Sequence, residues 1–317
     1  MHEHDIKIGN TIRQLRERKN MSQAELCKPD FADKICSMRH LSRIENGETT
    51  PHPRTLYRLL EGLGVSLSEF THLIAEPDIA NFQHDFSEIW DLLFEKRYEK
   101  AASLLDALKT KPYCNIDNPL IEQALLMCDA SFVDAKNNNN GCLTHLHKAM
   151  RLTSPHVFEN NELSHNYISR NMFTLNEYRI LMYFAIIKSR LGFTNECILT
   201  LSAMCESLNN KKIDVEIKNR LLPTIYYNLS DELIDSKCYE EALSYCEKGI
   251  SLCKKAKNYK TLPHLYYSIA KVFIILGNKD RAEENFRQSY NIFSAHGDNE
   301  TALQVKKLVA TKYNLWL

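Results

Sequence analysis

Apolar side chains recur at every third or fourth position along most of this chain, and this spacing predicts amphipathic α-helices. No segment alternates apolar and polar residues for long enough to build a sheet. Several prolines are expected just ahead of a helix, where a missing N–H costs little, and these are Pro119, Pro223 and Pro263. The pattern therefore predicts an all-α protein, which excludes most nucleotide-binding and hydrolase folds.

Residues 1–70 are predicted to form a compact set of short helices. Their expected ranges are 8–19, 22–27, 37–46, 54–63 and a last helix from 66 onward. Ser22 and Glu25 have the spacing of a capping box, in which each side chain bonds the other residue's backbone N–H. In the third helix, Leu41 and Ile44 are expected to face inward.

Three sequence blocks in this region follow one another in the order found in a known class of DNA-binding domain. They are Met21-Ser-Gln-Ala-Glu-Leu26, Leu41-Ser-Arg-Ile-Glu-Asn-Gly47 and Leu63-Gly-Val-Ser-Leu-Ser-Glu-Phe70. Residues 1–70 therefore resemble the phage-repressor-type (XRE) helix-turn-helix. The stretch 28–36 departs from that pattern because it is longer than the usual tight turn, which leaves the start of the recognition helix open by one or two positions.

A short helix held across another can enter the major groove of DNA and present its N-terminal side chains to base edges. Arg39 and Arg43 share a helix face, and arginine reads guanine through two hydrogen bonds; the alternative, two ordinary solvated charges, is disfavoured inside this motif. Gln23 is expected to donate to a phosphate. Glu45 is expected to brace the domain, because phosphates repel a carboxylate. The expected DNA-binding residues are Gln23, Ser37, Met38, Arg39, His40 and Arg43.

Residues from 81 onward fall into about five helix pairs that resemble tetratricopeptide repeats, whose period is about 34 residues. Small side chains at Ala101, Ala242 and Ala282 stand where the second helix of a pair crosses the first. Stacked pairs of this kind form a right-handed superhelix with a concave groove. The asparagine run 137–140 is expected to be a solvated loop. The expected domains are a helix-turn-helix domain (1–70), a linker helix (71–80), a repeat domain (81–298) and a C-terminal capping helix (299–317).

The repeat register predicts which side chains face this groove. The expected peptide-binding residues are Arg179, Tyr183, Thr224, Tyr227, Asn228, Asp231, His264, Tyr267 and Lys271. The Asn228 amide could pair with the N–H and C=O of an extended peptide backbone. A structural role, in which Asn228 bonds neighbouring helices, is equally open. Tyr227 and Tyr267 could form stacking walls with a polar tip.

The combination of these two domains resembles the Rgg/PlcR/PrgX (RRNPP) family of peptide-pheromone receptors, and the match at Tyr227-Asn228 and Leu265-Tyr-Tyr267 is similar to the PlcR branch. The resemblance implies a cytoplasmic quorum-sensing transcription factor, a homodimer whose affinity for operator DNA is set by a short signalling peptide. It also implies that Asn228 holds the backbone of that peptide. The middle repeats are less regular than those of the family, which leaves the position of the pocket open.

Composition and charge add few further candidates. Forty basic and forty acidic residues balance, so a coat of nucleic-acid-binding charge is not expected. No catalytic motif is present, so neither an enzyme nor a cofactor is expected. Cys142, His145 and His147 lack a fourth neighbour and the common face that a metal site needs. No apolar run is long enough for a membrane span.

Ten cysteines in a chain that starts without a signal peptide indicate free thiols in a reducing cytosol. Cys27 and Cys36 flank the long turn, so a redox switch formed by these two cysteines is an alternative to two inert thiols.

The sequence also allows an alternative function, in which the repeats bind a partner protein and the DNA-binding head is secondary. Affinity for short peptides, compared with affinity for folded partners, would separate the two functions.

Overall fold

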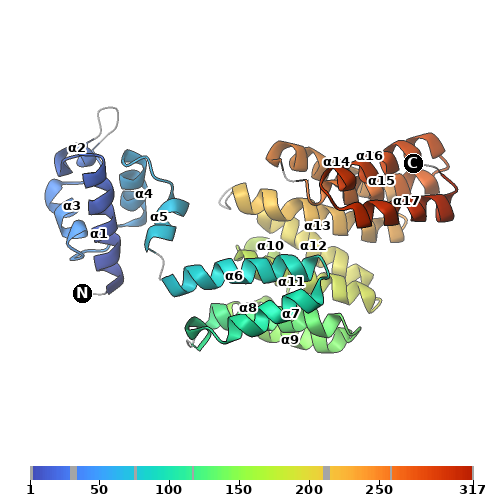
Figure 1. Cartoon of the computed structure of the whole chain (residues 1–317), viewed down its shortest axis with the longest axis horizontal. Coiled ribbons are helices and arrows are strands. Elements are labelled where there is room, and N and C mark those ends of the chain that lie inside the picture. The colour runs from blue at the N-terminus through green and yellow to red at the C-terminus, as the bar shows by residue number, and fades with distance from the viewer. Residues whose placement is uncertain are drawn as a thin grey trace. The chain divides into compact units, whose positions relative to one another are not determined.

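The computed structural model describes residues 3–28, 34–74, 77–115, 118–209, 215–257 and 259–315. The chain divides into two compact units, Met1–Ile116 and Asp117–Leu317, and each is described by itself. Within the described residues, the strands are limited to a two-stranded hairpin of β1 (Phe158–Glu159) and β2 (Glu162–Leu163). The prediction of an all-α protein is therefore confirmed (Figure 1).

The first unit begins with five helices that enclose a common core. They are α1 (Glu3–Arg18), α2 (Gln23–Cys27), α3 (Met38–Glu45), α4 (Pro53–Gly62) and α5 (Leu67–Ile74). Ile12, Leu41, Ile44, Leu59 and Phe70 have no exposed surface and pack into one cluster. The predicted inward positions Leu41 and Ile44 are thus confirmed. Most of the long stretch 28–36, residues 29–33, lies outside the described residues.

The first unit continues with one antiparallel helix pair. It consists of α6 (Pro77–Phe94) and α7 (Tyr98–Lys109), followed by the short 3-10 helix η1 (Pro112–Asn115). Ala101 has no exposed surface where α7 packs on α6. The expected linker helix 71–80 corresponds to the end of α5 and the start of α6, with residues 75–76 outside the described part.

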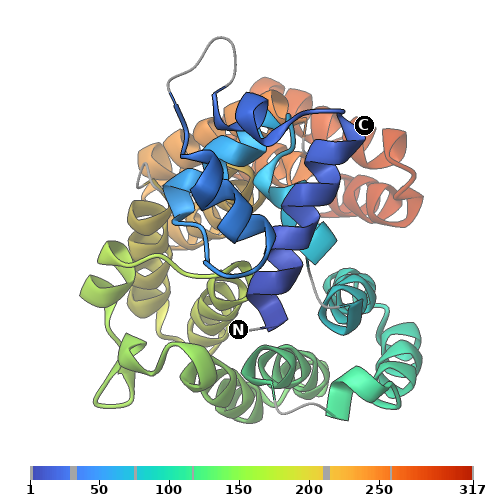
Figure 2. The ribbon, with the colours of Figure 1, turned by 90° about the vertical axis from the view of Figure 1, so that its left-hand side faces the viewer.

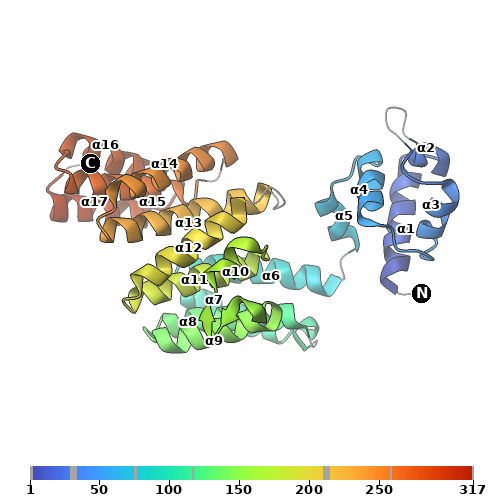
Figure 3. The ribbon, with the colours of Figure 1, turned by 180° about the vertical axis from the view of Figure 1, so that it is seen from behind.

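The second unit is a stack of helix pairs. Its helices are α8 (Pro119–Asp134), α9 (Asn139–Thr153), η2 (Pro155–Val157), α10 (His165–Arg170), α11 (Leu175–Arg190), α12 (Thr194–Asn209), α13 (Val215–Asp235), α14 (Tyr239–Ala256), α15 (Leu262–Ile275), α16 (Lys279–Ala295) and α17 (Asn299–Tyr313). Four pairs, α8–α9, α11–α12, α13–α14 and α15–α16, pack internally and follow one another along an arc (Figure 2). The hairpin and α10 are inserted before α11, and α10 packs on α12 (Figure 3). Helix α17 packs on α16, and its expected role as a cap of the repeats stays a prediction.

Small residues permit close packing of these pairs. Ala242 and Ala282 have no exposed surface, as the repeat pattern predicts. Gly249 lies inside α14, and a Cβ atom at this position would stand 2.8 Å from Leu265 Cδ1 on α15. A side chain larger than hydrogen would therefore push two successive pairs apart.

Two local expectations are wrong. Pro223 does not precede its helix but lies inside α13, which begins eight residues earlier at Val215. Apart from Asn219, the residues of α13 before Pro223 are apolar or good helix formers, so the helix continues across the proline although one backbone hydrogen bond is lost. The asparagine run is only partly a loop, because Asn138 caps α9 through Gly141 N–H and Asn139 and Asn140 already belong to its first turn.

Candidate nucleic-acid interface and peptide-binding face

Helix α3 presents one polar face outward from the first unit. Its N-terminus is capped by Ser37, whose Oγ accepts the backbone N–H of His40 at 3.1 Å. Met38 is 55% exposed, and Arg39 is also exposed. Arg43 keeps 53% of its side chain exposed, with its Nε 3.6 Å from Glu48 Oε2. The side chains expected to read bases are therefore accessible on one short, capped helix.

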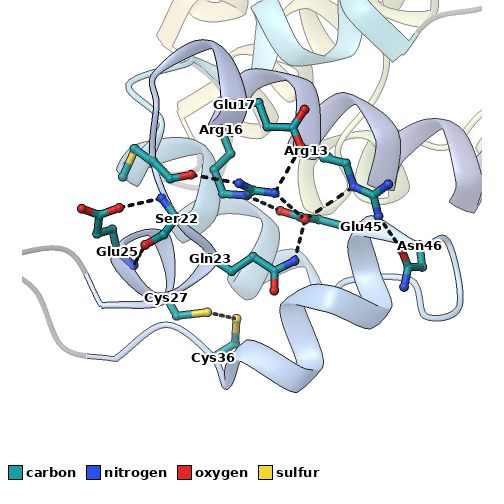
Figure 4. A network of polar contacts seen from close by, with 11 residues as sticks. Arg13, Arg16, Glu17, Ser22, Gln23, Glu25, Cys27, Cys36, Glu45 and Asn46 are labelled. Atoms are coloured by element: carbon teal, nitrogen blue, oxygen red, sulfur yellow. Dashed lines mark hydrogen bonds and ion pairs between the residues drawn. The ribbon is translucent and has the colours of Figure 1, made fainter.

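A buried carboxylate fixes α3 against the two helices that precede it (Figure 4). Glu45 has no exposed surface and accepts two hydrogen bonds from Arg16, at 2.7 Å from Nε and 2.9 Å from a terminal nitrogen. Gln23 Nε2 donates a third at 2.8 Å. Burial raises the pKa of Glu45, but the hydrogen bonds from Arg16 and Gln23 outweigh it, so the pKa lies below its ordinary value. The expected bracing role of Glu45 is confirmed.

This network also shows what sequence reasoning missed. Gln23 donates to Glu45 rather than lying wholly free at the surface, and its expected phosphate contact stays a prediction. Arg13 joins the network from the side, with its Nε 3.7 Å from Glu45 and a hydrogen bond to Asn46. Neither Arg13 nor Arg16 has a local sequence signal, because their partners lie about thirty residues away along the chain.

The capping box predicted for Ser22 and Glu25 is present at the start of α2, and the start of α5 has a second one. Ser22 Oγ accepts the Glu25 N–H at 3.2 Å, and Glu25 accepts the Ser22 N–H at 2.6 Å. Hydrogen bonds from the Ser22 side chain and backbone to the Glu25 carboxylate lower its pKa. Ser66 and Glu69 form the same pair of bonds at the start of α5. Two of the sequence blocks on which the resemblance rests thus contain the N-cap of a helix.

In the second unit, most of the expected peptide-binding residues come together where α13 lies beside α15. Asp231 on α13 forms an ion pair with Lys271 on α15. The rings of Tyr227 and His264 lie 5.2 Å apart between centroids. Thr224 Oγ1 lies 3.1 Å from Thr261 Oγ1, just before α15. We call the residues Thr224, Tyr227, Asn228, Asp231, His264, Tyr267 and Lys271 the α13–α15 face.

Asn228 lies among these contacts with one amide hydrogen already engaged. Its Nδ2 donates to the backbone carbonyl of Thr224, one turn earlier on α13, at 3.0 Å. This bond orients the amide along its own helix rather than tying α13 to a neighbour. The hydrogen bond of Asn228 thus lies within α13 and not, as the structural alternative expected, between helices. Its contact with a peptide backbone stays a prediction.

An aromatic cluster supports the α13–α15 face. His264 meets Phe293 edge to face at 5.1 Å between centroids, and Tyr267 meets Phe286 in the same way at 5.2 Å. Burial raises the pKa of Tyr227 to about 12, and it lowers the pKa of His264. Both side chains are therefore neutral at pH 7, so they offer hydrogen bonds and ring surface rather than charge.

The two remaining expected residues lie elsewhere, on α11. Arg179 hydrogen-bonds Asn176 on its own helix at 3.1 Å. Tyr183 donates its hydroxyl to Asp134 on α8 at 2.8 Å, and Arg190 donates to the other oxygen of Asp134 at 2.7 Å. Asp134 thus joins two successive pairs, a role that no local pattern of the sequence indicates.

Comparisons with known protein families identify both the helix-turn-helix domain and the helix repeats. Residues 12–70 match the Helix-turn-helix family, and residues 223–255 and 263–296 each match the Tetratricopeptide repeat family. No curated protein sequence matches the chain. Among the described residues, no helix is both long and apolar enough to cross a membrane.

Several solved structures share the fold along nearly the whole chain. Bacillus thuringiensis PlcR in complex with the peptide PapR7 and DNA superposes with a TM-score of 0.68 at 18% identity, covering 94% of this chain and 99% of that one. The Streptococcus dysgalactiae SHP pheromone receptor Rgg2 superposes with a TM-score of 0.60 at 19% identity, covering 96% of this chain and 99% of that one. ComR from S. thermophilus, in complex with DNA and its signalling peptide ComS, superposes with a TM-score of 0.57 at 20% identity, covering 95% of this chain and 97% of that one. The chain thus joins a helix-turn-helix domain to tetratricopeptide repeats, in the fold that it shares with PlcR, Rgg2 and ComR.

Proposed function

We propose that this chain is a cytoplasmic quorum-sensing transcriptional regulator, which binds operator DNA as a homodimer under the control of a short linear peptide bound to its repeats. The observation that carries the proposal is the exposed polar face of α3, held rigidly by the buried Arg16–Glu45–Gln23 network. The structures of PlcR and ComR that share this fold contain both DNA and a peptide, which supports the same pair of ligands here.

The face of α3 suits the major groove of a DNA duplex. That groove is about 12 Å wide and admits one helix. Arg39 and Arg43 stand one turn apart on the exposed face, where each guanidinium can reach the O6 and N7 atoms of a guanine. The N-terminus of α2 adds a partial positive charge beside Gln23, where a phosphate binds.

The α13–α15 face suits the backbone of an extended peptide. Asn228 keeps an amide oxygen and a second N–H that match a peptide group, and neither demands a particular side chain. Tyr227 and Tyr267 add ring surface on either side, and the Asp231–Lys271 pair adds one charge of each sign.

Coupling between the two ligands follows from the stacking of helix pairs. A peptide that contacts α13 and α15 together favours one curvature of the stack. In a dimer, this curvature sets the distance between the two α3 helices, which must match half-sites about 34 Å apart. The peptide shifts DNA binding only as far as its affinities for the two curvatures differ.

The peptide site is tested with Asn228→Ala and a matched control, Asn285→Ala. Asn285 on α16 also donates its amide to a carbonyl one turn earlier, at 2.8 Å, but it lies outside the α13–α15 face. A randomised library of linear peptides is panned against the wild-type chain, and the enriched peptide is titrated into all three proteins by calorimetry. We expect the Asn228 variant to lose at least tenfold in affinity and the Asn285 variant to bind as wild type does. Equal affinity in all three proteins would contradict the assignment.

A further inference from the structure

Two thiols meet between the end of α2 and the start of α3. Cys27 is the last residue of α2, and Cys36 directly precedes Ser37, the N-cap of α3. Their sulfur atoms lie 3.7 Å apart (Figure 4). We propose that Cys27 and Cys36 are a modification site, which a peroxide converts into an intramolecular disulfide that joins α2 to α3.

The chain on either side of residues 29–33 holds the two cysteines in place. The backbone N–H of Ile35 donates to the carbonyl of Cys27 at 2.8 Å. Cys27 is only 3% exposed and belongs to the core of the first five helices, against which Ile35 and Cys36 also pack. A covalent S–S bond measures about 2.05 Å, so the sulfurs must approach further, which small rotations of two side chains can supply. Neither helix has to leave its position.

The reaction needs only the two thiols and the peroxide. Cys36 is the more exposed of the two residues. Its thiolate attacks one oxygen of hydrogen peroxide and gives a sulfenic acid and hydroxide, and the hydroxide takes up the proton that the Cys36 thiol released and becomes water. Cys27 then displaces the second oxygen as water and completes the S–S bond. Two thiols are oxidised by two electrons, and one peroxide is reduced to two molecules of water.

The environment makes this reaction slow but its product stable. Burial raises the pKa of Cys27 to about 12, and burial also raises the pKa of Cys36, so both are mainly thiols at pH 7. The pair therefore responds to sustained exposure rather than to a brief pulse of peroxide. Once formed, the disulfide closes the segment 28–35 into a loop and restricts the unfolded chain, which stabilises the first unit. The proposal does not depend on the proposed function.

The product can be identified directly in the full-length protein. Trypsin does not cut the Lys28–Pro29 bond, so Cys27 lies in the fragment 20–34 and Cys36 in the fragment 35–39. After treatment with hydrogen peroxide and alkylation of the remaining thiols, we expect mass spectrometry to find these two fragments joined and to find them separate after reduction. Recovery of both cysteines alkylated, or of Cys36 as a sulfinic acid without the joined fragments, would overturn the proposal.

Thermal unfolding supplies a second readout. We expect peroxide to raise the melting temperature of the first unit by about 5–15 °C in the wild type. Cys36→Ser and Cys27→Ala should each abolish the rise, and circular dichroism before oxidation shows whether each variant is folded. Cys238→Ser, which removes an exposed thiol from the second unit, should keep the rise. A rise that persists in both folded variants of the pair would also overturn the proposal.

Discussion

On helix α3, single residues divide between holding the domain together and remaining available to a ligand. Leu41, Ile44 and Glu45 have no exposed surface, whereas Met38 on the same helix is 55% exposed. The apolar spacing predicts Leu41 and Ile44 correctly, because helical periodicity is a local property. The partner of Glu45 could not be predicted in the same way, since Arg16 comes from a different helix 29 residues away.

The two exposed arginines of α3 carry the first prediction. Arg39→Ala or Arg43→Ala should each weaken binding to a selected DNA site by about 1–3 kcal/mol and relax the preference at one base position. Arg287→Ala on α16, which removes an equally exposed arginine from the second unit, is the control and should leave DNA binding unchanged. Fluorescence anisotropy with a labelled duplex measures all three. Wild-type affinity in both α3 variants would show that this face does not read bases.

The second prediction concerns the buried carboxylate of Glu45. Glu45→Gln removes the buried counter-charge of Arg16 and leaves it only the exposed carboxylate of Glu17, at 3.7 Å. We therefore expect a loss of about 3–5 kcal/mol in the free energy of unfolding of the first unit. Glu48→Gln is the matched control, because Glu48 is 49% exposed and pairs loosely with Arg43. The Glu48→Gln substitution should lower the free energy of unfolding of the first unit by no more than about 1 kcal/mol. Urea unfolding followed by circular dichroism distinguishes the two, and equal losses would contradict the role given to the network.

At the scale of elements, the pairs of helices follow from the sequence better than the contacts between pairs do. The alanines Ala242 and Ala282 mark the crossing points inside a pair, so the pairs α13–α14 and α15–α16 were predictable. The bridge from Tyr183 to Asp134 was not, because 49 residues separate the two and either could have faced solvent. Pro223 misled the prediction for α13 because a proline lowers helix propensity only locally, whereas packing along the whole helix outweighs this loss.

The α13–α15 contact predicts a pH dependence. Burial lowers the pKa of His264 in the folded protein, so the unfolded chain binds a proton more readily than the folded one. The stability that the neutral His264 allows is therefore fully present above about pH 6.5, the ordinary pKa of histidine. The free energy of unfolding of the second unit falls as the pH is lowered toward about 5. The pKa values of His147 and His165 are lowered for the same reason and contribute in the same direction.

This dependence is measured by urea unfolding at several pH values between 5 and 7.5. His264→Phe keeps an aromatic ring between Tyr227 and Phe293 but cannot take up a proton, so its slope with pH should be smaller than that of the wild type. Asn285→Ala on α16, which removes no titratable group, should keep the wild-type slope. A slope unchanged by the loss of His264 would mean that its burial does not oppose protonation.

For the whole molecule, the order of domains was predictable but the action of the ligands was not. The blocks from Met21 to Phe70 and the repeats around Tyr227 and Tyr267 predict a DNA-binding head and a peptide-binding body. The fold confirms a helix-turn-helix domain followed by tetratricopeptide repeats, and peptide binding by the repeats stays a proposal. In the proposed homodimer, the distance between the two α3 helices would depend on contacts between many helix pairs, and no local motif of the sequence encodes such contacts.

Selection from a randomised DNA duplex library, with and without the peptide obtained by panning, tests whether the full-length chain is a dimeric DNA-binding protein under the control of a peptide. We predict that the enriched sequence is an inverted repeat with half-sites about 34 Å apart, centre to centre, and that the peptide changes its affinity severalfold. Enrichment of no sequence, or of an inverted repeat whose affinity is the same with and without the bound peptide, would contradict the account.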